Sequence, residues 1–356
     1  MLAAVVGLDL HASGSRESEE FVWQLPRGVP RPRVPSDNPM SAAKVRLGRQ
    51  LFYDARLSGN GTFSCASCHQ QRFAFTDGLP HAVGSTGQSH ARSAMSLANV
   101  AFNASYGWAD SRARTLEAQM AVPMFNEHPI EMGIKGNEPA IVARIGSDPA
   151  DAELFQEAFP NQPISLATVV KAIASFERTL ISANSPVDRY LYRDDRAALA
   201  ADAQRGMALF FSERLACARC HTGFNLSGPT THHGGAVVAP SFHNTGLYNV
   251  DGRGSYPAID RGLFDRTHVA TDMGRFRAPT LRNIAVTAPY MHDGSIPTLV
   301  EVIGHYAAGG VSSPFKSPRL KGFPITAAEV SDLVAFLNSL TDAEFLSNPE
   351  FAPPKR

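Results

Sequence analysis

The chain has 356 residues, and its 33 lysines and arginines balance 33 aspartates and glutamates, which leaves a formal net charge of zero. This balance argues against a nucleic-acid-binding protein, because such a protein needs a basic surface that displaces counterions. With 44% hydrophobic and 19% charged residues the composition excludes a disordered chain, and the length favours two domains over one.

The N-terminal segment, residues 1–34, contains no pattern typical of a helix or strand. Its apolar start, Met1 to Leu8, is short and lacks a basic region, so it is either a clipped signal peptide or an uninformative N-terminus. The proline-bearing stretch from Phe21 to Pro39 predicts a strap that lies over the surface. No apolar run approaches the ~20 residues of a membrane span, so we expect no such span.

All four cysteines lie in two copies of one pattern, Cys-x-x-Cys-His. This is the attachment pattern of haem c, in which the thiols add across the haem vinyl groups and the histidine binds the iron. A lone copy could also be half of a zinc site or a redox dithiol, but a four-cysteine zinc site does not require a histidine after each pair. We therefore predict two covalently bound haem c groups, held by Cys65, Cys68 and His69 and by Cys217, Cys220 and His221.

An internal repeat extends around both motifs. GRQLFYDARL at 48–57 and GMALFFSERL at 206–215 share six positions at identical offsets, and each predicts an amphipathic helix that leads into a haem motif. Ser41 is the predicted N-cap of the first helix, and Phe210 and Phe211 are among the apolar residues of the second. VKAIASFERTL at 170–180 resembles VSDLVAFLNSL at 330–340, which predicts a closing helix in each copy.

The order of leading helix, haem motif and closing helix predicts a mostly α fold, with two cytochrome c-like haem domains and long loops. We place the boundary between the domains in the polar stretch from Asp188 to Asp202. The predicted domains are residues 35–187 and 200–345. The tail, residues 346–356, is expected to be an extended end.

The function depends on the second axial ligand of each iron. A haem that only transfers electrons usually has two protein ligands, whereas a haem that reacts with peroxide or oxygen leaves one position open. Spacing alone does not choose among the donors that follow the motifs. These are His81, His90 and Met95 after the first motif and His232, His233, His243, His268, Met273, Met291, His292, His305 and Tyr306 after the second.

The two haem motifs, the segment APTLRNIAVTAPYMHDG at 278–294 and the segment at 108–132 resemble the bacterial di-haem cytochrome c peroxidase and MauG superfamily. The resemblance extends over residues 35–345. It implies that the haem of the first domain reacts with hydrogen peroxide and that the haem of the second domain transfers electrons.

The resemblance also suggests the second ligand of each iron. Tyr306 stands where the peroxidases have a methionine and MauG has a tyrosine, so Tyr306 is implied as the second ligand of the second iron, with His305 as the alternative. Ser85 stands where the peroxidases have a removable distal histidine. The first iron is therefore expected to be five-coordinate at rest, unless His81 or His90 binds it.

The peroxide site implied by the resemblance consists of Gln119, Pro123 and Glu131. A carboxylate suits this site because it can take a proton from one peroxide oxygen and return it to the other. Trp108 matches the tryptophan that relays electrons between the haems. Leu215 stands where MauG has a further tryptophan, so the electron path must differ from that of MauG.

A calcium ion between the domains is also implied by the resemblance. Thr287 and Pro289 match two of the family's ligand positions, and Ser93 stands where the family has an asparagine. This substitution puts the calcium site in doubt.

Finer details of the sequence, including FHNTGLYN and HYAAGG, resemble the MbnH-type di-haem enzymes, whose partner is a periplasmic copper-binding protein with a tryptophan oxidised to kynurenine. The resemblance implies an oxidoreductase that reacts with hydrogen peroxide, forms a high-valent, bis-ferryl-like state and oxidises a side chain of a partner protein, most readily tryptophan. The alternatives are a cytochrome c peroxidase that reduces peroxide with electrons from a small redox protein, and a di-haem electron carrier. Haem c is attached outside the bacterial cytoplasm, so we expect a periplasmic protein.

Overall fold

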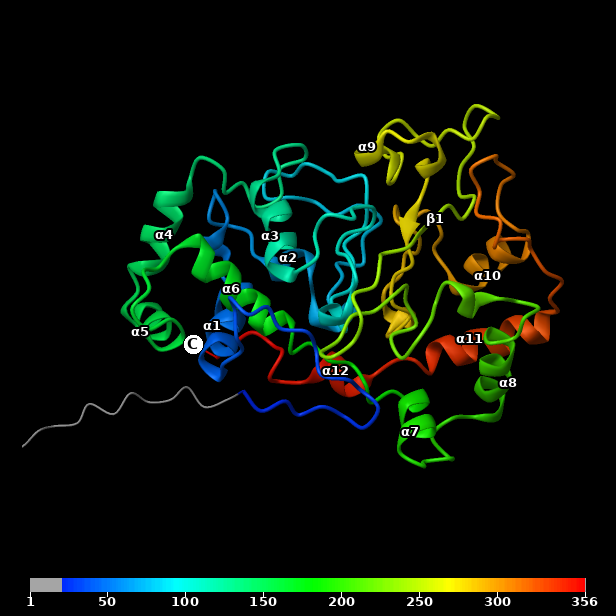
Figure 1. Cartoon of the computed structure of the whole chain (residues 1–356), viewed down its shortest axis with the longest axis horizontal. Coiled ribbons are helices and arrows are strands. Elements are labelled where there is room, and N and C mark those ends of the chain that lie inside the picture. The colour runs from blue at the N-terminus through cyan, green and yellow to red at the C-terminus, as the bar shows by residue number, and fades with distance from the viewer. Residues whose placement is uncertain (1–20, 356) are drawn as a thin grey trace, which may run out of the picture.

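The computed structural model describes residues 21–355, and the interpretation of Met1 to Leu8 falls outside this range. Figure 1 shows that most regular structure is helical, which confirms the predicted fold class. The helices are α1 Ala42–Phe52, α2 Cys65–Cys68, α3 Leu116–Phe125, α4 Glu138–Gly146, α5 Pro149–Ala158, α6 Leu166–Glu177, α7 Pro186–Tyr192, α8 Ala201–Phe210, α9 Phe264–Thr267, α10 Leu299–Ala307, α11 Ala327–Asn338 and α12 Ala343–Ser347. Strands β1 Phe242–His243 and β2 Phe276–Arg277 pair antiparallel. Within the described range, no helix is long and apolar enough to cross a membrane.

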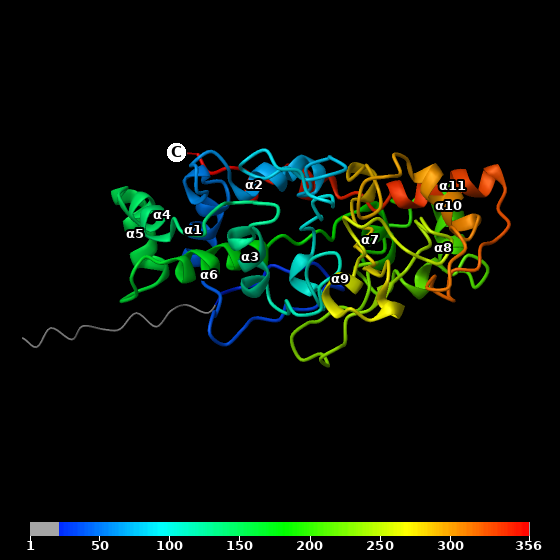
Figure 2. The ribbon, with the colours of Figure 1, turned by 90° about the horizontal axis from the view of Figure 1, so that it is seen from above.

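The predicted repeat appears as two crossed helix pairs, α1 with α6 and α8 with α11, which lie in opposite halves of the molecule (Figures 1 and 2). Each crossing depends on a glycine. A Cβ on Gly48 would lie 1.9 Å from the carbonyl oxygen of Ala172, and a Cβ on Gly206 would lie 1.9 Å from that of Asp332. Both copies retain glycine because the backbones of the leading and closing helices touch at this point.

Each helix pair belongs to its own hydrophobic core. The first core includes Phe52 of α1 and Phe176 of α6, and the second includes Phe210 of α8 and Phe336 of α11. Ser41 caps α1 as predicted, because its Oγ accepts a hydrogen bond from the backbone of Lys44 at 3.2 Å. The expectation that Phe211 lies on the buried face is wrong. Phe211 follows the last residue of α8 and is 51% exposed.

The polar stretch from Asp188 to Asp202 is partly helical, because α7 extends into it. Asp188 is 3% exposed, and its carboxylate accepts hydrogen bonds from both terminal nitrogens of Arg282, at 2.7 and 2.9 Å. The preceding Val187 packs into the second core. Asp188, which the sequence places in a linker, therefore forms a buried ion pair with Arg282. This pair connects α7 to the segment at 278–294.

Both ends of the described chain hold the two halves together. The strap forms hydrogen bonds to both halves. Asn38 donates to the carboxylate of Glu117 in the first half, and the carbonyl of Arg31 accepts from the backbone N–H of His233 in the second. After the second core the chain returns to the first, where Phe345 of α12 is buried. The tail is attached to α1, because the hydroxyl of Tyr53 donates to the carbonyl of Phe351 at 2.6 Å.

Alanine at either crossing glycine should destabilise the protein by about 1–3 kcal/mol, because a Cβ forces the helix backbones apart. The variants are Gly48→Ala and Gly206→Ala, measured by denaturant unfolding of the holoprotein followed by far-UV circular dichroism. Gly304→Ala in α10 is the matched control, since a Cβ there meets open space. It should be neutral or stabilising by up to ~1 kcal/mol. Equal unfolding midpoints for the three variants would show that the crossings tolerate a side chain.

Candidate functional site

The first motif forms α2, a single helical turn that ends at His69. The Nδ1–H of His69 donates to the carbonyl oxygen of Phe75 at 2.7 Å. The chain reaches this position through two residues in the left-handed region, Ala74 and Phe75. Burial lowers the pKa of His69, so the ring is neutral near pH 7. A bond in which Nδ1–H donates fixes the tautomer whose Nε2 carries the lone pair, as an iron ligand requires.

The second motif repeats this arrangement. Cys217–Arg219 form one helical turn, and the Nδ1–H of His221 donates to the carbonyl oxygen of Leu226 at 3.0 Å. Leu226 is also in the left-handed region. Burial lowers the pKa of His221, so both motifs present a neutral imidazole that is oriented by a backbone carbonyl.

The four cysteines, all within the described chain, form no disulfide, and Cys65 packs against the first core whereas Cys217 packs against the second. This separation is inconsistent with one four-cysteine zinc site. Burial raises the pKa of the Cys217 thiol to about 11, and burial with nearby charges raises that of Cys68 to about 12. Both thiols are therefore protonated and uncharged near pH 7.

A large cavity, with an empty volume of about 1540 Å³ that includes open solvent, adjoins the second motif. Cys217, Cys220 and His221 line one part of it, and apolar side chains such as Leu299 and Leu333 line much of the rest. A neutral histidine, two thiols and an apolar surround are the environment that a haem c needs. The residues present therefore fit a haem at this motif.

The cavity selects among the candidate ligands of the second iron. His243, Met291, His292 and Tyr306 line it, whereas His232, His233, His268, Met273 and His305 do not. The Nε2–H of His305 donates to the carbonyl of Thr245 at 3.0 Å, so the alternative ligand is already engaged. Burial and the nearby Cys217 and Cys220 raise the pKa of the Tyr306 phenol.

The predicted peroxide residues lie around α3, which carries Gln119 and Pro123. The carbonyl of Pro123 accepts from the backbone N–H of Met132 at 2.9 Å, which holds the segment with Glu131 against this helix. Burial raises the pKa of Glu131 to about 7. Glu131 also lies near the first motif, because its charge contributes to the raised pKa of Cys68.

The loop after the first motif brings Ser85 to the backbone of Glu131 and His90 to its carboxyl group. The N–H of Ser85 donates to the carbonyl oxygen of Glu131 at 2.8 Å, and Nδ1 of His90 lies 3.8 Å from Oε1 of Glu131. His81 is exposed. The sequence suggested His90 only as an iron ligand, and nothing in its spacing indicates its place beside Glu131.

Trp108 lies where the two halves meet. It lines the second cavity, and its Nε1–H donates to the carbonyl of Ser93 at 2.9 Å. Its own carbonyl accepts from the backbone N–H of Arg277 at 2.8 Å. The N–H of Ser93 in turn donates to the carbonyl of His292, so hydrogen bonds connect both halves through the indole. Leu215 also lines the second cavity.

The calcium site stays a prediction. The hydroxyl of Ser93 donates weakly to the carbonyl of His292 at 3.3 Å, and that of Thr287 donates to the carbonyl of Ile284 at 3.1 Å. Both hydroxyls therefore have protein partners of their own. Neither bond involves Pro289.

Two buried charged groups near the haem motifs escaped the sequence analysis. Arg277 is 9% exposed, donates to the carbonyl of Gly107 and contacts the sulfur of Met95, and burial lowers its pKa to about 10. Glu177 of α6 is 8% exposed beside Cys65, and burial raises its pKa to about 8. The sequence around Arg277 and Glu177 contains no motif that marks either residue, so only the fold shows which groups these two side chains contact.

Comparisons with known proteins agree with this geometry. Residues 42–196 match a family model described as di-haem cytochrome c peroxidase, and residues 275–306 match one described as RoxA-like, cytochrome c-like. The methylamine utilization protein MauG of Methylorubrum extorquens is 37% identical over 319 residues, which cover 89% of this chain and 83% of that protein. Cytochrome c551 peroxidase of Pseudomonas aeruginosa is 33% identical, over 85% of this chain and 80% of that protein.

Solved structures give the same result. A MauG-like protein associated with microbial copper homeostasis superposes with a TM-score of 0.91 and 46% identity, covering 94% of this chain and 100% of that one. The di-haem peroxidase BthA of Burkholderia thailandensis, at 24% identity and a TM-score of 0.67, shares the fold over 93% of this chain and 95% of its own.

Proposed function

Because the chain belongs to the di-haem cytochrome c peroxidase and MauG family of oxidoreductases, we propose that it uses hydrogen peroxide to oxidise an aromatic side chain of a periplasmic partner protein. Two haem c groups supply the redox chemistry when bound. Peroxide takes up two electrons and two protons and is released as two water molecules, while the partner loses two electrons and two protons and takes up one oxygen atom from water. The similarity to a MauG-like protein associated with microbial copper homeostasis supports a copper-binding partner. The oxidised residue that we propose for this partner is tryptophan.

The observation that carries this proposal is the tyrosine in the second cavity. Tyr306 lines the cavity that Cys217 and His221 also line, and the competing His305 is bonded to a backbone carbonyl. A phenolate ligand stabilises ferric iron and lowers its reduction potential. A site of this kind accepts electrons poorly from a small redox protein, which disfavours the alternative function of a cytochrome c peroxidase.

The chain's own residues move the peroxide proton. Glu131 takes a proton from one oxygen of hydrogen peroxide and returns it to the leaving oxygen. Gln119 and Pro123 shape this site from α3, and the hydrogen bond from Met132 to Pro123 keeps Glu131 in place. Trp108 relays electrons, because it lines the second cavity and is bonded to the first half through Ser93.

Tyr306→Phe should remove a ligand of the second iron. We expect the resting ferric protein to show one high-spin and one low-spin signal in electron paramagnetic resonance, and the variant to lose the native low-spin signal. His305→Gln is the control and should leave both signals in place, because His305 faces Thr245. An unchanged spectrum in Tyr306→Phe would shift the assignment to His243, Met291 or His292, which line the same cavity.

The rate of reaction with peroxide should rise as the pH increases through about 7, because Glu131 accepts a proton only when it is ionised and burial raises its pKa to about 7. Glu131→Gln should slow the reaction by ~10²–10⁴-fold and remove this pH dependence. Resting spectra of both haems should be unchanged. Stopped-flow measurements between pH 5.5 and about 8.5 test both points, and a native rate in the variant would leave Glu131 without a catalytic role.

Trp108→Phe should slow oxidation of the partner more than it slows the reaction with peroxide, because the indole lies between the two haem sites. The experiment combines stopped-flow spectroscopy with mass spectrometry of a periplasmic copper-binding protein incubated with the holoprotein and peroxide. We expect the partner to gain oxygen on tryptophan. Rapid multiple turnover with reduced cytochrome c and no gain in partner mass would instead support the ordinary peroxidase.

A further inference from the structure

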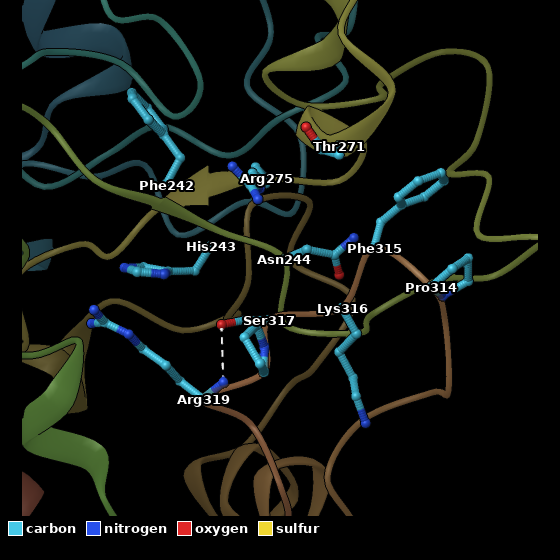
Figure 3. Close-up of a pocket in the computed structure, with 11 residues that line it drawn as sticks. Phe242, His243, Asn244, Thr271, Arg275, Pro314, Phe315, Lys316, Ser317 and Arg319 are labelled. Atoms are coloured by element: carbon cyan, nitrogen blue, oxygen red, sulfur yellow. Dashed lines mark hydrogen bonds between the residues drawn. The ribbon is translucent and has the colours of Figure 1, made fainter.

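A second pocket, with an empty volume of about 730 Å³ that includes open solvent, opens beside the cavity of the second haem motif (Figure 3). Strand β1, the turn that carries Thr271 and the loop of residues 314–319 form its walls. Four residues line both this pocket and the cavity, namely His243, Asn244, Ser317 and Arg319. A single layer of side chains therefore separates the second haem site from this part of the surface.

The pocket is positively charged. Arg275, Lys316 and Arg319 line it, whereas no acidic side chain does. Arg275 pairs with the nearby Asp272 at 3.1 Å. Lys316 donates to the carbonyl of Gly309 at 2.8 Å and Arg319 to that of Arg219 at 3.0 Å, and neutral carbonyls do not compensate a charge. In a chain of zero formal net charge, this is a local excess of cations.

His243 adds no charge of its own near pH 7. Burial and the charges of Arg319, His221 and Arg275 lower its pKa to about 4. Figure 3 shows the imidazole ring of His243 and the guanidinium group of Arg319 on the same side of the pocket. The positive field therefore comes from Arg319 and Lys316, because Asp272 compensates the charge of Arg275.

Exposed apolar side chains belong to the same segments. Val269 is 50% exposed and precedes the turn of Thr271, and Val311 is 48% exposed and precedes the loop of residues 314–319. Val250 is 61% exposed, and its neighbour Asn249 donates to the carbonyl of Ser312. Large exposed apolar side chains beside a charged pocket are typical of a protein interface rather than of a site for a small anion.

We propose that this pocket is the docking surface for the partner protein, with the exposed valines of the adjoining segments as further contacts, and that the partner presents an acidic surface segment whose carboxylates face Lys316 and Arg319. This inference rests on the proposed function, which requires electrons to pass from a bound protein to the second haem site. Docking here places the partner one layer of side chains from that site. Trp108, which also lines the cavity of the second haem motif, then relays the electrons towards the first half.

The test measures binding by isothermal titration calorimetry, without peroxide, so failure of the proposed oxidation would not affect the result. The probes are succinylated horse cytochrome c, which is acidic, and native horse cytochrome c, which is basic. The holoprotein should bind the acidic probe at least ~10-fold more tightly at low ionic strength, and added salt should weaken this binding.

Lys316→Glu should weaken binding of the acidic probe by about tenfold, and the neutral variant Lys316→Gln by about threefold, since each removes part of the positive field. Lys316 lines the pocket but not the haem cavity. Arg193→Glu, an exposed charge reversal at the end of α7, is the matched control and should change binding by less than about twofold.

Equal binding of the two probes, or an affinity for the acidic probe that neither Lys316 variant changes, would overturn the docking surface. Binding of inorganic phosphate that depends on Lys316, without binding of the acidic cytochrome, would identify a small-anion site and also overturn it. Oxidation of the partner with no dependence on Lys316 would leave the proposed function in place while excluding this surface.

Discussion

The hydrogen bond from the Nδ1–H of each proximal histidine to a backbone carbonyl is the interaction on which both sites depend. It orients His69 and His221 and fixes the tautomer in which Nε2 carries the lone pair, and burial lowers the pKa of both rings. The carbonyl acceptors come from left-handed residues five or six positions after each histidine. Because this turn must lie against the motif, the leading and closing helices have to pack closely around it, and the two crossing glycines permit that packing.

The two halves are coupled through one line of backbone and indole hydrogen bonds. Trp108 bonds to Ser93 and to Arg277, and Ser93 bonds to His292 in the second half. The return of α12 to the first core adds a further tie. A rigid junction of this kind suits a protein in which charge has to pass between two sites, because the groups between them keep fixed positions.

The charged groups near the first haem motif differ from those near the second, and each set suits a different task. Near the first motif, buried Glu131 has a pKa raised to about 7, which allows it to accept and release a proton near neutral pH. Near the second motif, a phenol, many apolar side chains and two arginines, Arg277 and Arg319, line the cavity, and Lys316 adds a further cation in the adjoining pocket. The two proposals therefore place proton transfer in the first half and contact with the partner in the second.

The sequence by itself determined the haem attachment sites, the mostly α fold and the paired helices, because each depends on residues close together in the chain or on a repeated pattern. Five consecutive residues define each haem motif, and the periodicity of a helix is local. Only the tertiary structure decided which of nine donors face the second cavity, that His90 lies beside Glu131, that Asp188 is buried and that Phe211 is exposed. These outcomes depend on segments far apart in the chain, since a side chain's partner and its access to water are set by what packs against it and not by its neighbours in sequence.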